Sequence, residues 1–305
     1  LNTTLTDWLK FNLTTRFVRK ENERPTAFNG WFYECFDRLT WPNLPVYDPN
    51  GYYFDNNATN PAMVLAEGGN RNTTSDQHYY QASLLIEPIK GWVTNIDFNY
   101  SILDYNVKET GLPVYNHDVN GNVVNTNGTS YLYNENKKED FWNLNVYSTY
   151  EHSFNDVHNL KVMAGLQIEE MKQEYSSVLK NGLMVDGMPQ FDLTTGTDGN
   201  GKELTPSIKG NYNEWATAGF FGRVNYDYKG RYLAEFNMRY DGTSRFRRGS
   251  RWQASPSASV GWNIANEEFW EPLSGTVNAL KLRFSYGELG NQNTNSWYPT
   301  YRMMY

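Results

Sequence analysis

Apolar and polar residues alternate with a period of two along much of this chain. Between Arg231 and Tyr240, the even positions carry Tyr, Ala, Phe, Met and Tyr, and the odd positions are mostly charged or amide residues. This alternation is typical of a strand with one apolar and one polar face. Further segments show it, starting near Leu9, Ala82, Trp92, Trp142, Leu160, Phe220, Ala254 and Leu280. We therefore predict about nine strands of about ten residues, the length that crosses a bilayer at a tilt.

Alternation alone does not separate a membrane barrel from a soluble sandwich, because both have an apolar and a polar face. The connections favour the barrel. Long connections are expected at roughly Lys20 to Asp76, Asp104 to Asp140 and Ser177 to Asn213, and short turns such as Glu87 to Gly91 lie between them. Outer-membrane barrels have short periplasmic turns and long outer loops. We expect an all-β fold, an antiparallel transmembrane β-barrel segment with long extracellular loops that forms an incomplete barrel of roughly nine or more strands.

The composition agrees with a barrel that has a polar lumen. Aromatic residues make up 16% of the 305 residues, whereas all hydrophobic residues together reach only 39%. A barrel needs apolar side chains only at alternate strand positions and places Trp and Tyr at the membrane interfaces. The net charge of -7 argues against a nucleic-acid partner. The single cysteine, Cys35, excludes a disulfide within these residues.

From Gly219 onward, short motifs follow one another in a specific order. They include Gly222-Arg223-Val224-Asn225-Tyr226, Lys229-Gly230-Arg231-Tyr232-Leu233, Asp241-Gly242-Thr243-Ser244-Arg245-Phe246, Glu267-Glu268-Phe269 and Gly290-Asn291-Gln292. Upstream, Asn60-Pro61 and Ile86-Glu87-Pro88-Ile89-Lys90-Gly91-Trp92 fit the same series. This order closely resembles the barrel of SusC/RagA-like TonB-dependent outer-membrane transporters.

The resemblance implies a large barrel with an internal plug, energised through TonB and closed by a SusD-like surface lipoprotein. It implies import of oligosaccharides or peptides at the cell outer membrane of a Bacteroidetes-like Gram-negative bacterium. We expect residues 1–305 to be part of the barrel domain, with the plug and the barrel ends outside this chain. We expect contact with outer-membrane lipid, no cofactor and no enzymatic activity.

Aromatic residues in the first long connection are candidates for substrate binding, because aromatic faces stack on sugar rings. They are Trp31, Trp41, Tyr47, Tyr52 and Tyr53. The same residues could instead form a small core of the loop or contact the lid, and the sequence leaves these alternatives open.

Two motifs mark points where strands lead into loops. One contains Asp241, Gly242, Ser244, Arg245 and Phe246, and the other contains Gly290, Asn291 and Gln292. They could contact substrate or lid, but a structural role is favoured. Asp-Gly sets a turn, Arg245 could pair with a carboxylate, and the amides could satisfy backbone groups.

We expect no metal site. Asp118 to Asn122 and Asp198 to Gly201 loosely resemble calcium loops but lack the closing glutamate, so Asn/Asp-Gly turns explain them better. Three other functions remain open: a lid-free siderophore or cobalamin receptor, a soluble carbohydrate-binding β-protein, and an adhesive surface protein.

Overall fold

The computed structural model describes residues 1–29, 32–34, 43–54, 60–118, 120–292, 294 and 296–300. Ten strands form one antiparallel sheet in the order β1-β2-β3-β4-β7-β8-β9-β10-β11-β12, and β5 and β6 pair separately. The strands are β1 (Asn2–Thr6), β2 (Leu9–Pro25), β3 (Asn70–Ile89), β4 (Trp92–Gly111), β5 (Val114–His117), β6 (Val123–Asn127), β7 (Tyr131–Phe154), β8 (His158–Asn181), β9 (Ser207–Tyr228), β10 (Tyr232–Thr243), β11 (Trp252–Asn263) and β12 (Lys281–Gly287). The helices are α2 (Pro61–Glu67), η1 (Phe191–Leu193), η2 (Arg248–Ser250), η3 (Ile264–Asn266) and η4 (Glu268–Leu273).

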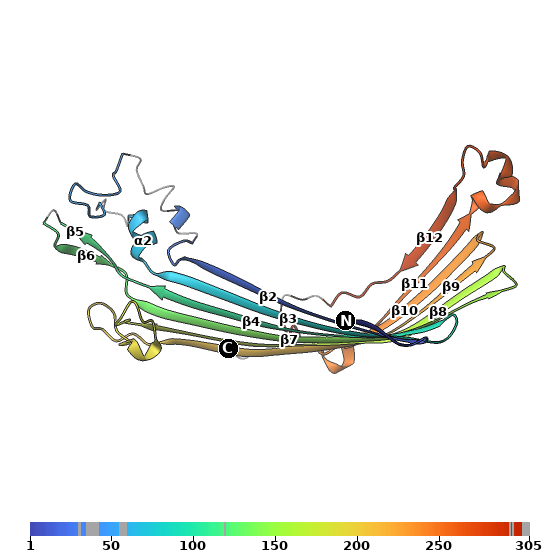
Figure 1. The fold of residues 1–305 in the computed structure, drawn as a ribbon, viewed down its shortest axis with the longest axis horizontal. Helices are drawn as coiled ribbons and strands as arrows, with labels where there is room; N and C mark the ends of the chain where they lie inside the picture. The colour runs from blue at the N-terminus through green and yellow to red at the C-terminus, as the bar shows by residue number, and fades with distance from the viewer. Residues whose placement is uncertain are drawn as a thin grey trace.

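The sheet is an open, curved wall with its long connections at one end and its turns at the other (Figure 1). Within the part of the chain that the structure describes, β1 and β12 are the free edges and the sheet does not close. The all-β antiparallel fold with long loops is therefore confirmed, as is its open form. None of the described helices is long and apolar enough to span a bilayer.

The strands are longer than predicted. β7 and β8 have 24 residues each, and β3 and β4 have 20. The predicted loop boundaries are therefore wrong, because the connections shrink to residues 26–69, 112–130 and 182–206. The apolar alternation stops where the strands become polar on both faces, but the hydrogen-bonded ladder continues without it. A tenth strand, β1, was also missed, since its short Thr-rich segment shows no alternation.

The register places the predicted apolar residues on one continuous face. Phe236 of β10 lies opposite Val224 of β9 and Ala258 of β11, and Phe98 of β4 lies opposite Leu144 of β7. In the described part of the chain this outer face is open to solvent: Phe236 is 50% exposed. Among the described residues, the buried hydrophobic side chains all lie in the loops or at the strand ends beside them. A soluble sandwich would bury this face against a second sheet.

Aromatic residues border the outer face at both ends. On β4, β7, β10 and β11 the bordering pairs are Trp92 and Tyr100, Trp142 and Tyr150, Tyr232 and Tyr240, and Trp252 and Trp262. Counted with its two border residues, each pair spans nine to eleven residues, the number that a tilted strand needs to cross a bilayer. With a rise of about 3.3 Å and a tilt of about 40°, the apolar band is about 20–25 Å tall.

The first long connection has a small core of its own at the loop end of the sheet. Met63 and Val64 of α2 pack with Val114 of β5 and are 0%, 8% and 3% exposed. Asn60 holds the start of α2: its Oδ1 accepts from the backbone N–H of Ala62, and its Nδ2 donates to the carbonyl of Val46 at 3.0 Å. One amide thus caps the helix and fixes the preceding segment against it.

Candidate functional site

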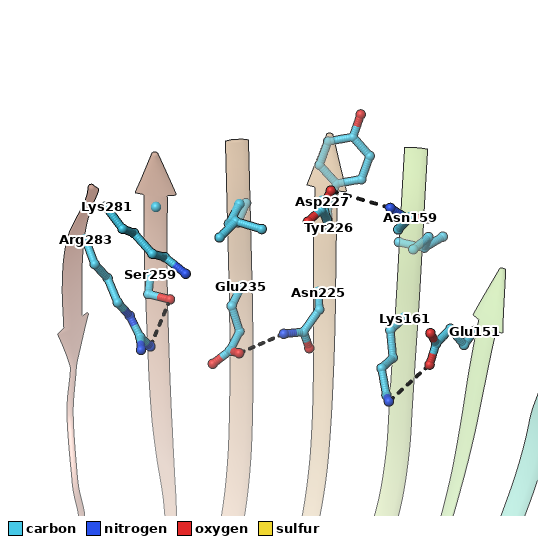
Figure 2. Close-up of a pocket in the computed structure, with 14 residues that line it drawn as sticks. Glu151, Asn159, Lys161, Asn225, Tyr226, Asp227, Glu235, Ser259, Lys281 and Arg283 are labelled. Atoms are coloured by element: carbon cyan, nitrogen blue, oxygen red, sulfur yellow. Dashed lines mark hydrogen bonds and ion pairs between the residues drawn. The ribbon is translucent and has the colours of Figure 1, made fainter. Parts of the chain in front are cut away.

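The inner face of β7 to β12 is polar, as expected for the lumen side of a barrel. A hollow of about 300 Å³ lies on this face, toward the short turns, and Figure 2 shows the residues that line it. Its charged side chains are Glu151, Asp227, Glu235, Lys161, Lys281 and Arg283. Lys161 Nζ lies 3.1 Å from Glu151 Oε2, Asn225 donates to Glu235 at 2.7 Å, and Arg283 donates to Ser259 at 3.3 Å. The charges balance, so this wall suits polar contact with a protein segment.

The two predicted motifs meet at the other end of the wall. A hollow of about 490 Å³ lies between the loop-side ends of β10 and β11 and the segment that follows β12. Its lining includes Asp241, Gly242, Phe246, Gly290, Asn291 and Gln292. Motifs about fifty residues apart in the sequence thus form one site, which we call the mouth pocket.

Asp241 and Gly242 lie within β10, opposite Gln253 and Trp252, so the expectation of an Asp-Gly turn here is wrong. Gly242 is needed because a Cβ would lie 2.7 Å from the indole of Trp252. That indole occupies the space of the missing side chain and stacks on Tyr240 at 4.9 Å.

The carboxylate of Asp241 faces the mouth pocket together with a guanidinium. Arg239 donates to it through two nitrogens, Nε at 3.0 Å and Nη2 at 2.8 Å. Gly219 on β9 provides the room, since a Cβ there would overlap the carboxylate. Both partners remain partly exposed, at 47% and 39% of their side-chain surface. Arg239 and Asp241 thus form a bidentate, charge-assisted pair at the pocket wall.

Ser244 and Arg245 anchor the loop that follows β10. The backbone N–H of Ser244 donates to the carbonyl of Ala216, and Ser244 Oγ accepts from the Ala216 N–H, both at 2.9 Å. Arg245 was expected to pair with a carboxylate. Its guanidinium instead lies over the rings of Trp215 at 4.9 Å and Trp297 at 6.0 Å. Cation–π contact therefore replaces the expected ion pair.

Trp215 belongs to an aromatic group on the inner face that the sequence did not reveal. Its ring centroid lies 6.3 Å from that of Phe141, and both stand opposite Met171 of β8. These rings occupy odd positions beside the outer border at Trp142, so a scan for one apolar face misses them. We call the rings of Phe141 and Trp215, which lie on either side of Met171, the inner aromatic row.

The described tyrosines of the first loop have different surroundings, and Trp31 and Trp41 lie outside the described residues. Tyr53 packs against the loop core, and burial, followed by a hydrogen bond with Tyr47, raises its pKa. Tyr52 stacks on His117 at 4.7 Å. Tyr47 is 53% exposed. Of these three, Tyr47 is the most accessible to a ligand.

Three loop tips have the same turn. In Asp48-Pro49-Asn50-Gly51, Asp118 to Gly121 and Asp198 to Gly201, the aspartate Oδ1 accepts two backbone N–H groups at 2.8–2.9 Å. Glycine follows with φ of +80° to +87°. The Asn/Asp-Gly turns expected at Asp118 to Asn122 and Asp198 to Gly201 are present. The turn at Asp48 to Gly51 was not predicted, although it has the same Asp-x-Asn-Gly sequence pattern as the other two. In the described ranges, no group of three His, Cys or acidic residues is placed to hold a metal.

The turn between β11 and β12 is clamped to the turn before β10. Arg231 donates to Glu267 at 3.3 Å and to Glu268 at 3.2 Å. Hydrogen bonds from Tyr232 and from the indole of Trp262, the latter at 2.9 Å, lower the pKa of Glu267. These contacts join the long turn to the end of β9 and the start of β10.

Comparison with known proteins agrees with this architecture. The chain belongs to the TonB-dependent receptor-like β-barrel family, whose model matches residues 28–302. TonB-dependent receptor P39 of Formosa agariphila is 31% identical over 266 residues, covering 82% of this chain and 23% of that protein. TonB-dependent receptor SusC of Bacteroides thetaiotaomicron is 25% identical over 313 residues, covering 94% of this chain and 29% of SusC.

The chain thus spans about a quarter of the length of these curated relatives. Among solved structures, the RagAB peptide transporter matches with a TM-score of 0.74 at 20% identity, covering 94% of this chain and 31% of that chain. The RagAB peptide importer in the "open-open" state matches with a TM-score of 0.72 at 21% identity, covering 96% and 32%. The SusC/RagA-type resemblance is therefore confirmed.

Proposed function

We propose that this chain is part of the barrel wall of an outer-membrane importer for oligosaccharides or peptides. A SusD-like surface lipoprotein would close over it, and TonB would supply energy through regions outside this chain. The observation that carries the proposal is the two-faced wall: an uncovered apolar band of bilayer height, backed by a polar face, in a member of the TonB-dependent receptor family.

Each face has its own task in this proposal. The apolar band lies in lipid between its aromatic borders, where Trp and Tyr favour the interface. The balanced charges of the inner hollow hydrogen-bond to the plug without attracting a single sign of charge. The wall binds and guides cargo and makes no covalent bond.

The strand extensions raise the loops well above the membrane. Beyond Tyr100 and Trp142, β4 and β7 continue for eleven residues each, which at a tilt of about 40° gives about 25–30 Å of wall outside the bilayer. A wall of this height supports a lid far from the lipid surface and encloses a chamber below it.

The mouth pocket and the inner aromatic row lie at the base of this chamber, beside the outer aromatic border, so cargo would reach them after passing the loops. Arg239 and Asp241 offer donors and acceptors to hydroxyl or amide groups, and Trp215 offers an aromatic face. Tyr47, Trp31 and Trp41 stay candidates for contacts in the outer loop.

The test is growth of a deletion strain on single polymers or peptide mixtures, with the full-length gene returned. Alanine at Trp215 or Phe141 should slow growth on the cargo nutrient, whereas alanine at the outward-facing Trp142 should not. A strain that loses growth on a glycan alone identifies oligosaccharide cargo, and loss on peptides alone identifies peptide cargo. A deletion strain with unimpaired growth on every nutrient would refute import.

A further inference from the structure

The turn between β11 and β12 differs from its neighbours on the same end of the sheet. The turns after β3, β7 and β9 contain two or three residues, whereas this one runs from residue 264 to residue 280 and holds η3 and η4. In Figure 1 it is the bulky orange-red segment beyond the end of β11. A hairpin needs no such length, so the segment requires another explanation.

Large apolar side chains of this turn point into open space. Phe269 is 63% exposed, Leu273 51% and Val277 42%. The turn is nevertheless ordered by specific contacts: Trp270 Nε1 donates to the carbonyl of Val277 at 2.9 Å, and Asn266 Nδ2 donates to the carbonyl of Gly230 at 2.9 Å. The side chains of Phe269 and Leu273 are thus exposed on a hydrogen-bonded turn.

The exposed ring of Phe269 continues the apolar outer face. It packs edge-on against Trp262, the border residue of β11, with ring centroids 6.4 Å apart. In a 3₁₀ helix, side chains three residues apart align, so Glu268 and Glu271 share one ridge, and the two other ridges are apolar: Phe269 with Pro272, and Trp270 with Leu273. The segment therefore has an apolar side joined to the lipid-facing band and an acidic side for water.

We propose that the β11–β12 turn is an interfacial membrane anchor that inserts Phe269 and Leu273 into the phospholipid leaflet on the short-turn side. The occupant is lipid because the apolar surface of the turn is continuous with the outer band through the contact between Phe269 and Trp262. This inference rests on the proposed membrane location of the wall. Interfacial segments of this kind bury their apolar side about 5–10 Å below the headgroups.

The experiment places a nitroxide label at one position at a time in the full-length protein, reconstituted in phosphatidylethanolamine–phosphatidylglycerol vesicles. In a cysteine-free background that includes Cys35→Ser, the labelled variants are Phe269→Cys, Phe236→Cys as the lipid control and Gly275→Cys as the water control. A Cβ at Gly275 meets no atom within 4 Å, so the label fits there. Power saturation then compares collisions with oxygen, which partitions into lipid, and with a water-soluble nickel chelate.

The label at Phe269→Cys should collide more with oxygen than with nickel, as at Phe236→Cys, and the label at Gly275→Cys should do the reverse. The calculated depth of the label at Phe269→Cys should be about 5–10 Å below the phosphates. Nickel access equal to that at Gly275→Cys would overturn the anchor, and so would protection from both reagents, which means that protein covers the site. If Phe236→Cys also prefers nickel, the membrane location itself fails.

Discussion

The free-energy cost of a single arginine, placed at different positions along β10, should show directly where the bilayer lies on this strand. Tyr232, Phe236 and Tyr240 share the outer face, with the tyrosines at the borders and Phe236 midway. Asn237, beside Phe236, faces inward and hydrogen-bonds to Arg223 and Glu235. Replacing each of the three outer residues with arginine samples three depths on one strand.

The expected magnitudes follow from the geometry. Phe236 is four residues from each border, which at a tilt of about 40° places it about 10 Å deeper than either tyrosine. Arginine on the lipid face of a barrel costs about 2–4 kcal/mol at mid-depth and about 0–1 kcal/mol near the interfaces. Phe236→Arg should therefore lower the folding equilibrium constant about thirtyfold or more, with much smaller effects at the two borders.

The assay is guanidinium unfolding of the full-length protein in phospholipid vesicles, followed by tryptophan fluorescence. Asn237→Leu serves as the inner-face comparison, since it tests whether loss of any central side chain on β10 has the same effect. The free-energy cost should be largest for Phe236→Arg. Equal costs at all three outer positions, or a peak at a border, would refute the assignment of this face to lipid.

Three further predictions concern the mouth pocket and the turns. Gly242→Ala should cost about 1–3 kcal/mol in thermal unfolding, because its Cβ collides with the indole of Trp252. Ser244→Ala should speed amide exchange at Ala216 roughly fivefold, since a hydrogen bond worth about 1 kcal/mol is lost. Glu267 has a lowered folded pKa, so its contribution is full above about pH 4.3 and is lost as the pH falls through the lower folded value. The protection factors of backbone amides in the β11–β12 turn, which compare the measured exchange with the intrinsic rate at each pH, should therefore fall on acidification, and less so in Glu267→Gln.

Each of these three predictions has a result that would contradict it. Gly249→Ala, where a Cβ meets no atom within 4 Å, should change stability by no more than about 0.5 kcal/mol. A Gly242→Ala protein as stable as Gly249→Ala would show that the indole does not need the space. Unchanged exchange at Ala216 would remove the anchoring role of Ser244. An identical acid response in wild type and Glu267→Gln would show that this carboxylate does not hold the turn.

The sequence predicted what depends on local alternation. Outer-face residues such as Phe236 and Phe98 were identified because period-two patterning is sufficient to assign a strand face. The polar strand ends were missed, since Lys137 and Tyr105 pair through backbone groups that carry no hydropathy signal. The predicted strand boundaries therefore marked the ends of the apolar band and not the ends of the hydrogen-bonded ladder.

The mouth pocket shows a different limit of prediction from the sequence. Motif order identified Asp241 and Asn291 as notable, but only strand register brings them to one hollow. Gly242 looked like a turn residue because a glycine in a strand and a glycine in a turn have the same sequence signal. The stacking of Arg245 on Trp215 joins residues on different elements, so no local pattern predicts it.

The most direct test of the account is to extract the full-length protein from outer membranes in mild detergent and identify what co-purifies. We expect a protein that stays in solution only with detergent and that carries a stoichiometric SusD-like lipoprotein. A detergent-dependent protein that purifies alone would contradict the lid and favour a lid-free receptor. Release into the aqueous fraction without detergent would contradict the membrane wall altogether.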